Sequence, residues 1–274
     1  MRFNILIACA LFMASGFAHA HHSKSGGLIE LWKEGKPAFG EYATPRHEKG
    51  RENSKEPPIF TVKNGRVLAA NPLLDFVFLN LEHYYHAQSV RGAVKGLQHE
   101  GTDDSKTLLV RIPPIHEDGL EISKARAMEA LELGANGIVL PHIRSAAEAR
   151  AAVSFFEGYN VWSPANPDGD IVVMLLVEDP KVMEELDEIA SIPGYSSLAC
   201  GIGSLTAALG GDREAAEKYN QQVLAASKRA GMVDLITATE ETMAMRVKQG
   251  FLGLLPIGDN QDNAIRLGRA AANP

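Results

Sequence analysis

Short apolar runs alternate with longer amphipathic stretches along most of the chain. From residue 75 onward the runs are FVFLNLE, TLLVRIP, GIVLPHI, IVVMLLVED, SLACGIG, VDLITAT and FLGLLPIG. The stretches between them have helical patterns, as in EISKARAMEALELG, SAAEARAAVSFF, PKVMEELDEIAS and REAAEKYNQQVLAASKRAG. This alternation predicts strands that are each followed by a helix, as in a parallel sheet.

An eighth strand is predicted earlier in the chain. The segment GGLIELWKEGKPAFGEYATP has the pattern of a short amphipathic helix followed by the strand AFGEYAT. Eight strand–helix repeats that close on themselves predict the α/β class and a (β/α)8 TIM barrel, here a single domain over residues 21–274. The alternative, an open doubly wound sheet, lacks a glycine fingerprint after its first strand.

Residues 46–71 interrupt the regular pattern. This segment is charged and rich in turn residues, and within it two apolar runs, IFTV and VLAA, flank KNGR. Asn64-Gly65 between apolar runs predicts a β-hairpin over residues 59–70. As an insertion after the first strand it lies on the face where barrel enzymes carry their sites, either as a lid or pocket wall or as a decoration without function.

The N-terminal residues predict secretion. Arg2 precedes an apolar run over residues 5–17, and Ala18-His19-Ala20 supplies a cleavage site, so residues 1–20 have the pattern of a signal peptide. No later apolar stretch has the pattern of a membrane span. Cys9 lies inside the signal, so the mature chain keeps only Cys200 and has no intrachain disulfide; Cys200 is expected to be a small buried side chain.

Composition favours a small-molecule enzyme over a nucleic-acid binder. Apolar residues make up 45% of the 274 and charged residues 22%, which is ordinary for a soluble globular enzyme. The net charge of -7, without a cluster of lysines and arginines, argues against a nucleic-acid surface.

Polar residues at the ends of the predicted strands are the candidates for chemistry. Active sites of TIM barrels lie at the C-terminal ends of their strands. A strand that leads through Gly201 and Gly203 into a helix also presents backbone N–H groups to an anion. The candidates are Glu41, Tyr42, Glu82, His83, Arg111, His142, Glu178, Asp179, Gly201 to Ser204 and Asp259.

Several of these segments, in the same order along nearly the whole mature chain, resemble one family. LIELWKEGKPAFGEYATP is similar to the opening helix and first strand of the HpcH/HpaI aldolases and their citrate lyase β-subunit relatives. LNLEHYYHA, VRIPP and LELGANGIVLPHIRSAAEA resemble further segments of that family. VMLLVEDPKVMEELDEIASIPG and GIGSLTAALG complete the likeness.

The resemblance implies a (β/α)8 barrel, assembled as a trimer or hexamer and commonly with an exchanged C-terminal helix. It also implies reversible aldol cleavage of 4-hydroxy-2-oxo acids, with Mg²⁺ or Mn²⁺ holding the 2-oxo acid. Such cleavage leaves an enolate, which a metal and a cationic donor stabilise, while a base removes the 4-hydroxyl proton.

The same resemblance assigns roles to individual residues. Arg111 matches the arginine that stabilises the developing enolate, and its permanent charge suits that task. His83 matches the histidine that acts as base or positions water. Glu178 matches the first metal-binding carboxylate. Glu82 is a weaker candidate, because adjacent strand residues point to opposite faces.

Three departures from the family distinguish this chain. Ser204 stands where the family carries the aspartate that completes the metal site. Asn80 stands where many members have the aspartate that pairs with the histidine. The Gly/Arg-rich segment before the Glu-bearing strand has no match in FFEGYNVWSPANPDGD. Losing a metal ligand lowers metal affinity by at least the roughly 10–100-fold that follows loss of an outer-shell partner.

Three outcomes for the metal site stay open. Glu178 alone binds Mg²⁺ weakly, with waters and substrate oxygens completing the shell. Alternatively, ligands from His142, Asp179 or His83 replace the missing aspartate, and a set of His and carboxylate suits Zn²⁺ or Fe²⁺. In the third case Arg111 and the N–H groups of Gly203, Ser204 and Leu205 hold the anion without a metal.

The sequence therefore predicts a secreted, periplasmic carbon–carbon lyase that acts on a small oxygenated carboxylate. The alternative from a different class is a non-catalytic or metal-independent carboxylate-binding barrel. Ser204 and Asn80 favour this alternative, whereas Arg111, His83 and Glu178 favour the enzyme.

Overall fold

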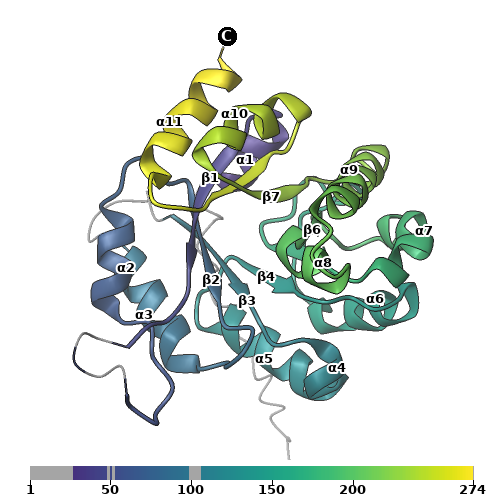
Figure 1. The fold of residues 1–274 in the computed structure, drawn as a ribbon. Helices are drawn as coiled ribbons and strands as arrows, with labels where there is room; N and C mark the ends of the chain where they lie inside the picture. Colours follow the sequence, from purple (N-terminus) through teal and green to yellow (C-terminus); the bar gives the residue numbers. More distant parts are fainter. Residues whose placement is uncertain (1–26, 48–49, 51–52, 99–105, 274) are drawn as a thin grey trace, which may run out of the picture.

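A computed structural model describes residues 27–47, 50, 53–98 and 106–273. Eight parallel strands form one sheet in the order β6-β5-β4-β3-β2-β1-β8-β7, and helices flank it (Figure 1). The strands are β1 Ala38–Ala43, β2 Phe76–Asn80, β3 Thr107–Arg111, β4 Gly137–Leu140, β5 Val172–Val177, β6 Ser197–Cys200, β7 Leu235–Ala238 and β8 Gly253–Pro256. All eight predicted strands are present, and the (β/α)8 barrel is confirmed. The signal peptide predicted for residues 1–20 lies outside the described residues.

The barrel closes most weakly between β6 and β7. Every other neighbouring pair forms a parallel ladder, whereas this junction holds one isolated parallel bridge between Ser197 and Val233. Leu198 N donates to Val233 O at 3.1 Å, and Val233 N donates to Ser196 O at 3.3 Å. The eight strands are therefore nearly closed into a ring.

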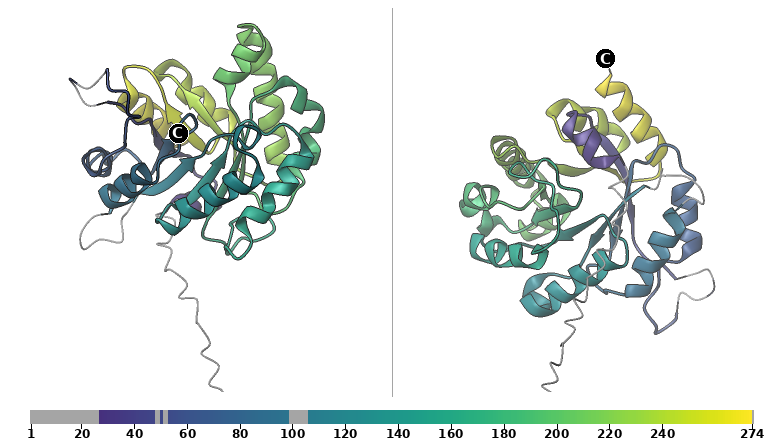
Figure 2. Two further views of the ribbon diagram at one scale, coloured as in Figure 1. Left: turned by 90° about the horizontal axis from the view of Figure 1, so that it is seen from below. Right: turned by 180° about the vertical axis from the view of Figure 1, so that it is seen from behind.

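Helices surround the strands on the outside, as the views from below and from behind show (Figure 2). Before and between the first strands lie α1 Leu28–Lys33, α2 Val62–Ala69, α3 Ala87–Leu97, α4 Ile115–Asp118 and α5 Leu120–Glu132. The later helices are α6 Ala146–Ala152, α7 Leu186–Ala190, α8 Ile202–Ala208, α9 Arg213–Arg229, α10 Glu240–Gln249 and α11 Gln261–Ala272, with the 3-10 turns η1 Val153–Phe156 and η2 Pro180–Glu185. Among the described residues no helix combines the length and apolar character needed to cross a membrane.

Alternate residues of each strand face two separate apolar clusters. In β5, Val173, Leu175 and Val177 pack in the cluster under the surrounding helices. Val172, Met174 and Leu176 pack instead in the barrel interior. Successive side chains of a strand point to opposite faces. The same alternation therefore indicates which residues just beyond each strand face the barrel interior.

Helix α1 packs against the interior cluster. Its Leu28, Ile29 and Trp32 are buried with the inward-facing residues of the strands. The Trp32 indole donates from Nε1 to Leu252 O at 2.8 Å and stacks on Trp162, with ring centroids 5.9 Å apart. The apolar face predicted for this short helix therefore fills part of the barrel core.

The hairpin predicted for residues 59–70 is wrong, because this segment forms helix α2. Thr61 caps the helix: its hydroxyl accepts from Asn64 N at 3.3 Å, while Asn64 Oδ1 accepts from Thr61 N at 2.9 Å. Gly65 serves helix packing rather than a turn, since a Cβ there would lie 2.8 Å from the Cα of Gly96 in α3. Asn-Gly thus acts as a cap partner followed by a close helix contact, and α2 is the first outer helix of the barrel.

The C-terminal segment is helical, as expected, and packs on its own barrel. Gly268 of α11 lies so close to the Phe39 ring that a Cβ there would meet it at 2.3 Å. Arg269 pairs with Asp75 at 3.0 Å and lies over the Phe39 ring. Packing of this segment on a neighbouring subunit, and the expected trimer or hexamer, stay predictions.

Two buried polar side chains near the outer cluster have no catalytic geometry. Cys200 is a free, buried cysteine, and burial raises the pKa of its thiol well above the usual range, so it is the inert side chain that was expected. Asp234, just before β7, is also buried, and its Oδ1 has no hydrogen-bond partner among the described residues. Burial raises the pKa of Asp234 well above its ordinary value, although Leu235 N–H and the Ser227 hydroxyl partly oppose this.

Asp234 is expected to make the protein less stable as the pH rises. Its pKa is higher in the folded than in the unfolded chain, so its stabilising contribution is complete below the unfolded pKa and is lost as the pH rises through the folded pKa. Between the two values the free energy of unfolding falls by about 1.4 kcal/mol per pH unit. We expect Asp234→Asn to remove this slope, so that the variant gains stability over wild type with rising pH. Urea unfolding of both proteins at several pH values measures it, and parallel curves would contradict it.

Candidate active site

In three strands, the alternation of inward-facing side chains continues past the apolar core to the residues of the candidate site. Phe78 of β2, Leu109 of β3 and Leu176 of β5 all belong to the interior cluster. Glu82 lies four residues beyond Phe78, and Arg111 and Glu178 each lie two residues beyond their interior neighbour. Because strand side chains alternate with a period of two, all three polar groups turn toward the barrel axis at the C-terminal ends of the strands.

Arg111 is bound between two carboxylates. Its Nη2 donates to Glu82 Oε1 and to both carboxylate oxygens of Glu178, at 2.9 Å to Oε2 and 3.2 Å to Oε1. Its Nη1 donates to the Tyr42 hydroxyl at 3.3 Å, whereas its Nε has no hydrogen-bond partner among the described residues. The Arg111 side chain is 6% exposed and that of Glu178 only 1%. These ions are therefore stabilised by one another rather than by water.

His142 completes the cluster through an unusual backbone conformation. Its φ of 50° is the one positive value among the described non-glycine residues. The turn brings its N–H to Glu178 Oε2 at 3.1 Å and its Nε2 to 2.7 Å from Glu82 Oε1. Its Nδ1 lies 3.4 Å from Glu178 Oε2. Left-handed backbone costs a non-glycine residue free energy, so the contacts of both ring nitrogens and the N–H compensate a local strain.

The cluster shifts the ionisation of two of its members. Burial favours the neutral form of Glu82, but the hydrogen bond from His142 and the charge of Arg111 outweigh it and lower the pKa of Glu82. The hydrogen bond to Glu82 raises the pKa of His142, with support from the charges of Glu178 and Glu82 and against the opposing effects of burial and Arg111. Carboxylate and imidazolium thus stabilise each other's charged forms.

A glycine makes room for the Glu178 side chain. Gly201, at the end of β6, lies against this carboxylate, and a Cβ at that position would meet Glu178 Oε1 at 2.1 Å. The φ of Gly201 is -74°, which any residue can adopt. The glycine is therefore required by space at the carboxylate and not by its backbone conformation.

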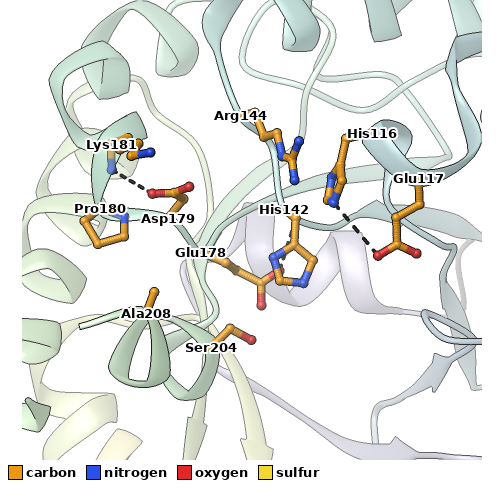
Figure 3. A pocket seen from close by; sticks show the side chains of 10 residues that line it. All are labelled: His116, Glu117, His142, Arg144, Glu178, Asp179, Pro180, Lys181, Ser204 and Ala208. Atoms are coloured by element: carbon orange, nitrogen blue, oxygen red, sulfur yellow. Dashed lines mark hydrogen bonds and ion pairs between the residues drawn. The ribbon is translucent and has the colours of Figure 1, made fainter. Parts of the chain in front are cut away.

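The cluster opens into a cavity of about 520 Å³ (Figure 3). The loops after β3, β4 and β5 and helix α8 supply its wall. The lining residues are His116, Glu117, His142, Arg144, Glu178, Asp179, Pro180, Lys181, Ser204 and Ala208. A cavity of this size, with ionisable groups at its base, suits a small polar ligand.

His83 does not join the cluster. Its side chain is 89% exposed, and its Nε2 lies 4.0 Å from Glu82 Oε2. Neither His83 nor Glu82 lines the cavity, but Glu82 bonds Arg111 and lies next to His142. From the sequence His83 was expected in the site and Glu82 was the weaker candidate, whereas the structure places Glu82 in the cluster and His83 outside it. The sequence does contain a signal for Glu82. Phe76 and Phe78 face the barrel interior, so the even-numbered positions that follow them, including Glu82, are expected to face inward as well.

The other predicted site residues lie in several places. Ser204 lines the cavity, but Leu205 N donates to Gly201 O at 2.9 Å and is already used inside helix α8. Gly203 lies in the first turn of that helix. The Asp179 carboxylate accepts from Lys181 N at 2.9 Å and so caps η2. Asn80 accepts from Glu82 N at 3.3 Å and shapes the loop that carries Glu82.

Three of these groups can reach a single metal ion. One donor atom each from Glu82, His142 and Glu178 lies within 4.8 Å of the other two. Two carboxylates and an imidazole fit a divalent metal, and the imidazole favours transition metals over Mg²⁺. Their oxygens already accept hydrogen bonds from Arg111 and His142, so a metal would compete with these donors.

Comparison with known proteins gives two aldolases and a citrate lyase subunit. The chain is 25% identical over 145 residues to 2-dehydro-3,6-dideoxy-6-sulfogluconate aldolase of Pseudomonas putida, covering 44% of this chain and 57% of the relative. It is 30% identical over 164 residues to 4-hydroxy-4-methyl-2-oxoglutarate aldolase of Chaetomium globosum, covering 52% of this chain and 58% of the relative. The matched region thus spans less than two thirds of each curated relative.

The structural comparison supports the fold. The citrate lyase beta subunit from M. tuberculosis, complexed with oxaloacetate and magnesium, superimposes with a TM-score of 0.58 at 21% identity. The superposition covers 90% of this chain and 100% of that chain. The family model for HpcH/HpaI aldolase/citrate lyase matches residues 69–254, which include every member of the Glu82–Arg111–His142–Glu178 cluster. The chain therefore belongs to the HpcH/HpaI aldolase/citrate lyase family.

Proposed function

We propose that this protein is a carbon–carbon lyase that cleaves a small oxygenated carboxylate such as a 4-hydroxy-2-oxo acid. The observation that carries the proposal is the buried Arg111, held between Glu82 and Glu178, where Glu178 also lines an open cavity. Aldolases and lyases make up the family, and both curated relatives are named as aldolases of oxygenated acids. These names support the reaction class and leave the substrate of this chain a proposal.

Arg111 is placed to stabilise negative charge that develops on a bound acid. Breaking the bond next to the oxygenated carbon leaves an enolate, and a fixed cation in a water-poor site lowers the energy of that charge. The Arg111 guanidinium carries the delocalised positive charge of an arginine, and its Nε has no hydrogen-bond partner among the described residues. His142 adds a second positive group, because its raised pKa favours the imidazolium. Together they supply the electrostatic part of the catalysis.

Proton removal from the 4-hydroxyl group needs a separate base. The family resemblance gives this role to His83, whose imidazole approaches the cluster only at Glu82. In this proposal His83 reaches the substrate from the solvent side, and Glu82 holds Arg111 and His142 in place. The assignment of His83 rests on the resemblance alone.

A divalent metal is part of the proposal. Glu178, Glu82 and His142 would hold it, with His142 as a neutral imidazole that has given up its proton. When bound, the metal would take over the positive charge of the imidazolium and supply a Lewis acid for the keto and carboxylate oxygens. Ser204 lines the same cavity but brings no charge. The chain would therefore bind Mg²⁺ more weakly than a site with a carboxylate in place of Ser204.

The first test is release of pyruvate or another 2-oxo acid from a panel of 4-hydroxy-2-oxo acids. We expect activity that EDTA lowers and that Mg²⁺ or Mn²⁺ restores. We expect Arg111→Ala to lower kcat by about 100-fold or more, the usual effect of removing a donor to a developing oxyanion. Arg150→Ala, which removes an exposed arginine that pairs with Glu188 on the surface, is the matched control.

Folding must be separated from catalysis in that test. Arg111→Ala leaves two buried carboxylates without their partner, so Arg111→Lys is measured beside it, with a thermal melt of each variant. Saturable binding of the acids with no product, whatever metal is added, would refute the lyase and favour a non-catalytic carboxylate-binding barrel. If Arg111→Ala stayed folded and fully active, the lyase would stand, and the role of Arg111 in stabilising the enolate would be refuted.

Ser204→Asp is expected to strengthen Mg²⁺ binding. A carboxylate at this position would add a hard oxygen ligand beside Glu178, and loss of a metal-site partner usually changes affinity by about 10–100-fold. Equilibrium dialysis with metal analysis compares wild type, Ser204→Asp and the uncharged control Ser204→Asn. Equal Mg²⁺ affinity in all three proteins would place the metal away from helix α8.

A further inference from the structure

The cavity extends well beyond the charged cluster at its base. Its volume of about 520 Å³ lies within the range of sites that hold ligands far larger than a three-carbon acid. Glu178, His142 and Ser204 line the inner part, next to Arg111. Residues beyond them supply the outer walls, so a ligand held at Arg111 has room to continue outward.

Two cations stand on the loops that carry the inner residues. Arg144 lies two residues after His142 on the loop after β4, and Lys181 lies three residues after Glu178 on the loop after β5. Figure 3 shows both side chains along one rim of the cavity, with the Arg144 guanidinium next to His116 and Lys181 next to Asp179. Each loop therefore contributes one group to the inner site and one cation farther out.

Neither cation has a partner on the described part of the chain. Arg144 and Lys181 use only their backbone N–H groups, toward Glu148 and Asp179, and no hydrogen bond or ion pair joins their side-chain nitrogens to another described residue.

The acidic side chains of the outer cavity, unlike these two cations, do have neighbours in the structure. Asp179 caps η2, and Glu117 lies 3.9 Å from His116 Nε2. Within the described part of the chain, the outer cavity thus holds two cations without a partner, while Asp179 has a hydrogen bond of its own and Glu117 lies nearest His116.

We propose that Arg144 and Lys181 form a second anion subsite, which selects substrates that carry another anionic group at the end remote from the reacting carbon. The inference rests on the proposed function for the identity of the inner group, a 2-oxo acid held at Arg111. A guanidinium after β4 and an ammonium after the neighbouring strand β5 suit a carboxylate, sulfonate or phosphate, since both donate charge-assisted hydrogen bonds to oxygen. The substrate class is then a dianionic acid.

The test compares two acids of equal length by calorimetry. 2-Oxoglutarate and 2-oxopentanoate both have five carbons and a 2-oxo acid group, and only the former ends in a second carboxylate. Dissociation constants are measured in Mg²⁺ for wild type, Arg144→Gln, Lys181→Gln and the double variant. Lys218→Gln, which removes an exposed lysine on α9 that is absent from the cavity lining, is the matched control.

Wild type is expected to bind 2-oxoglutarate about tenfold more tightly than 2-oxopentanoate, because two exposed ion pairs contribute up to about fivefold each. In each single variant the preference should fall from about tenfold to about threefold, which is half of it in free energy, and in the double variant it should nearly disappear. Binding of 2-oxopentanoate should stay unchanged throughout, and Lys218→Gln should behave as wild type. 2-Oxo-4-phosphonobutanoate extends the series, and tighter binding than 2-oxopentanoate supports the subsite for that anion also.

Equal affinity of wild type for 2-oxoglutarate and 2-oxopentanoate would overturn the proposal, as would a preference that survives in the double variant. Failure to bind either acid would overturn it together with the inner site. A preference that disappears in the double variant, in a protein that releases no 2-oxo acid from any substrate, would leave the subsite standing and refute only the lyase.

Discussion

The site depends on one buried ion cluster, the Arg111 guanidinium between the carboxylates of Glu82 and Glu178. Taking three charges out of water is costly, and the arrangement persists because each ion finds its counter-ion within hydrogen-bonding distance. Removing one partner from such a buried set typically costs about 3–5 kcal/mol, since it leaves a charge without compensation. The three residues come from the ends of three different strands. Charge compensation is therefore possible only once the barrel has formed.

The barrel creates this geometry in two ways: the strands alternate inward-facing and outward-facing side chains, and a glycine leaves room for one carboxylate. Interior residues alternate along β2, β3 and β5, and the polar groups occupy the next inward positions where each strand leaves the apolar core. Gly201 on β6 leaves the volume that the Glu178 carboxylate fills. His142 reaches the same carboxylate by a left-handed turn after β4. The apolar barrel thus acts as a rigid frame that holds a polar cluster at its open end.

Ser204 and His142 both make the proposed metal site less negative than a set of carboxylates would. Ser204 brings no charge to the first turn of α8, and His142 places an imidazole of raised pKa against the carboxylates of Glu82 and Glu178. A site with fewer negative charges and one more nitrogen ligand has less affinity for Mg²⁺ and relatively more for transition metals. The cavity outside it carries two further cations, Arg144 and Lys181. The whole pocket is therefore better suited to an anionic ligand than the acidic net charge of the chain indicates.

The alternation of apolar runs and amphipathic stretches determined the strands, the barrel and the strand ends that carry Arg111 and Glu178. These features depend on local periodicity, which a sequence displays directly. A hairpin was predicted for residues 59–70, because Asn-Gly in isolation is a turn signal. In the folded chain, the cap at Thr61 and the packing of Gly65 against Gly96 stabilise a helix there instead. Likewise, only the tertiary structure chose Glu82 over His83 and brought His142 into the cluster. Those contacts join residues 29 to 60 positions apart in the chain, and their formation depends on the closed barrel and on one strained turn rather than on any local pattern.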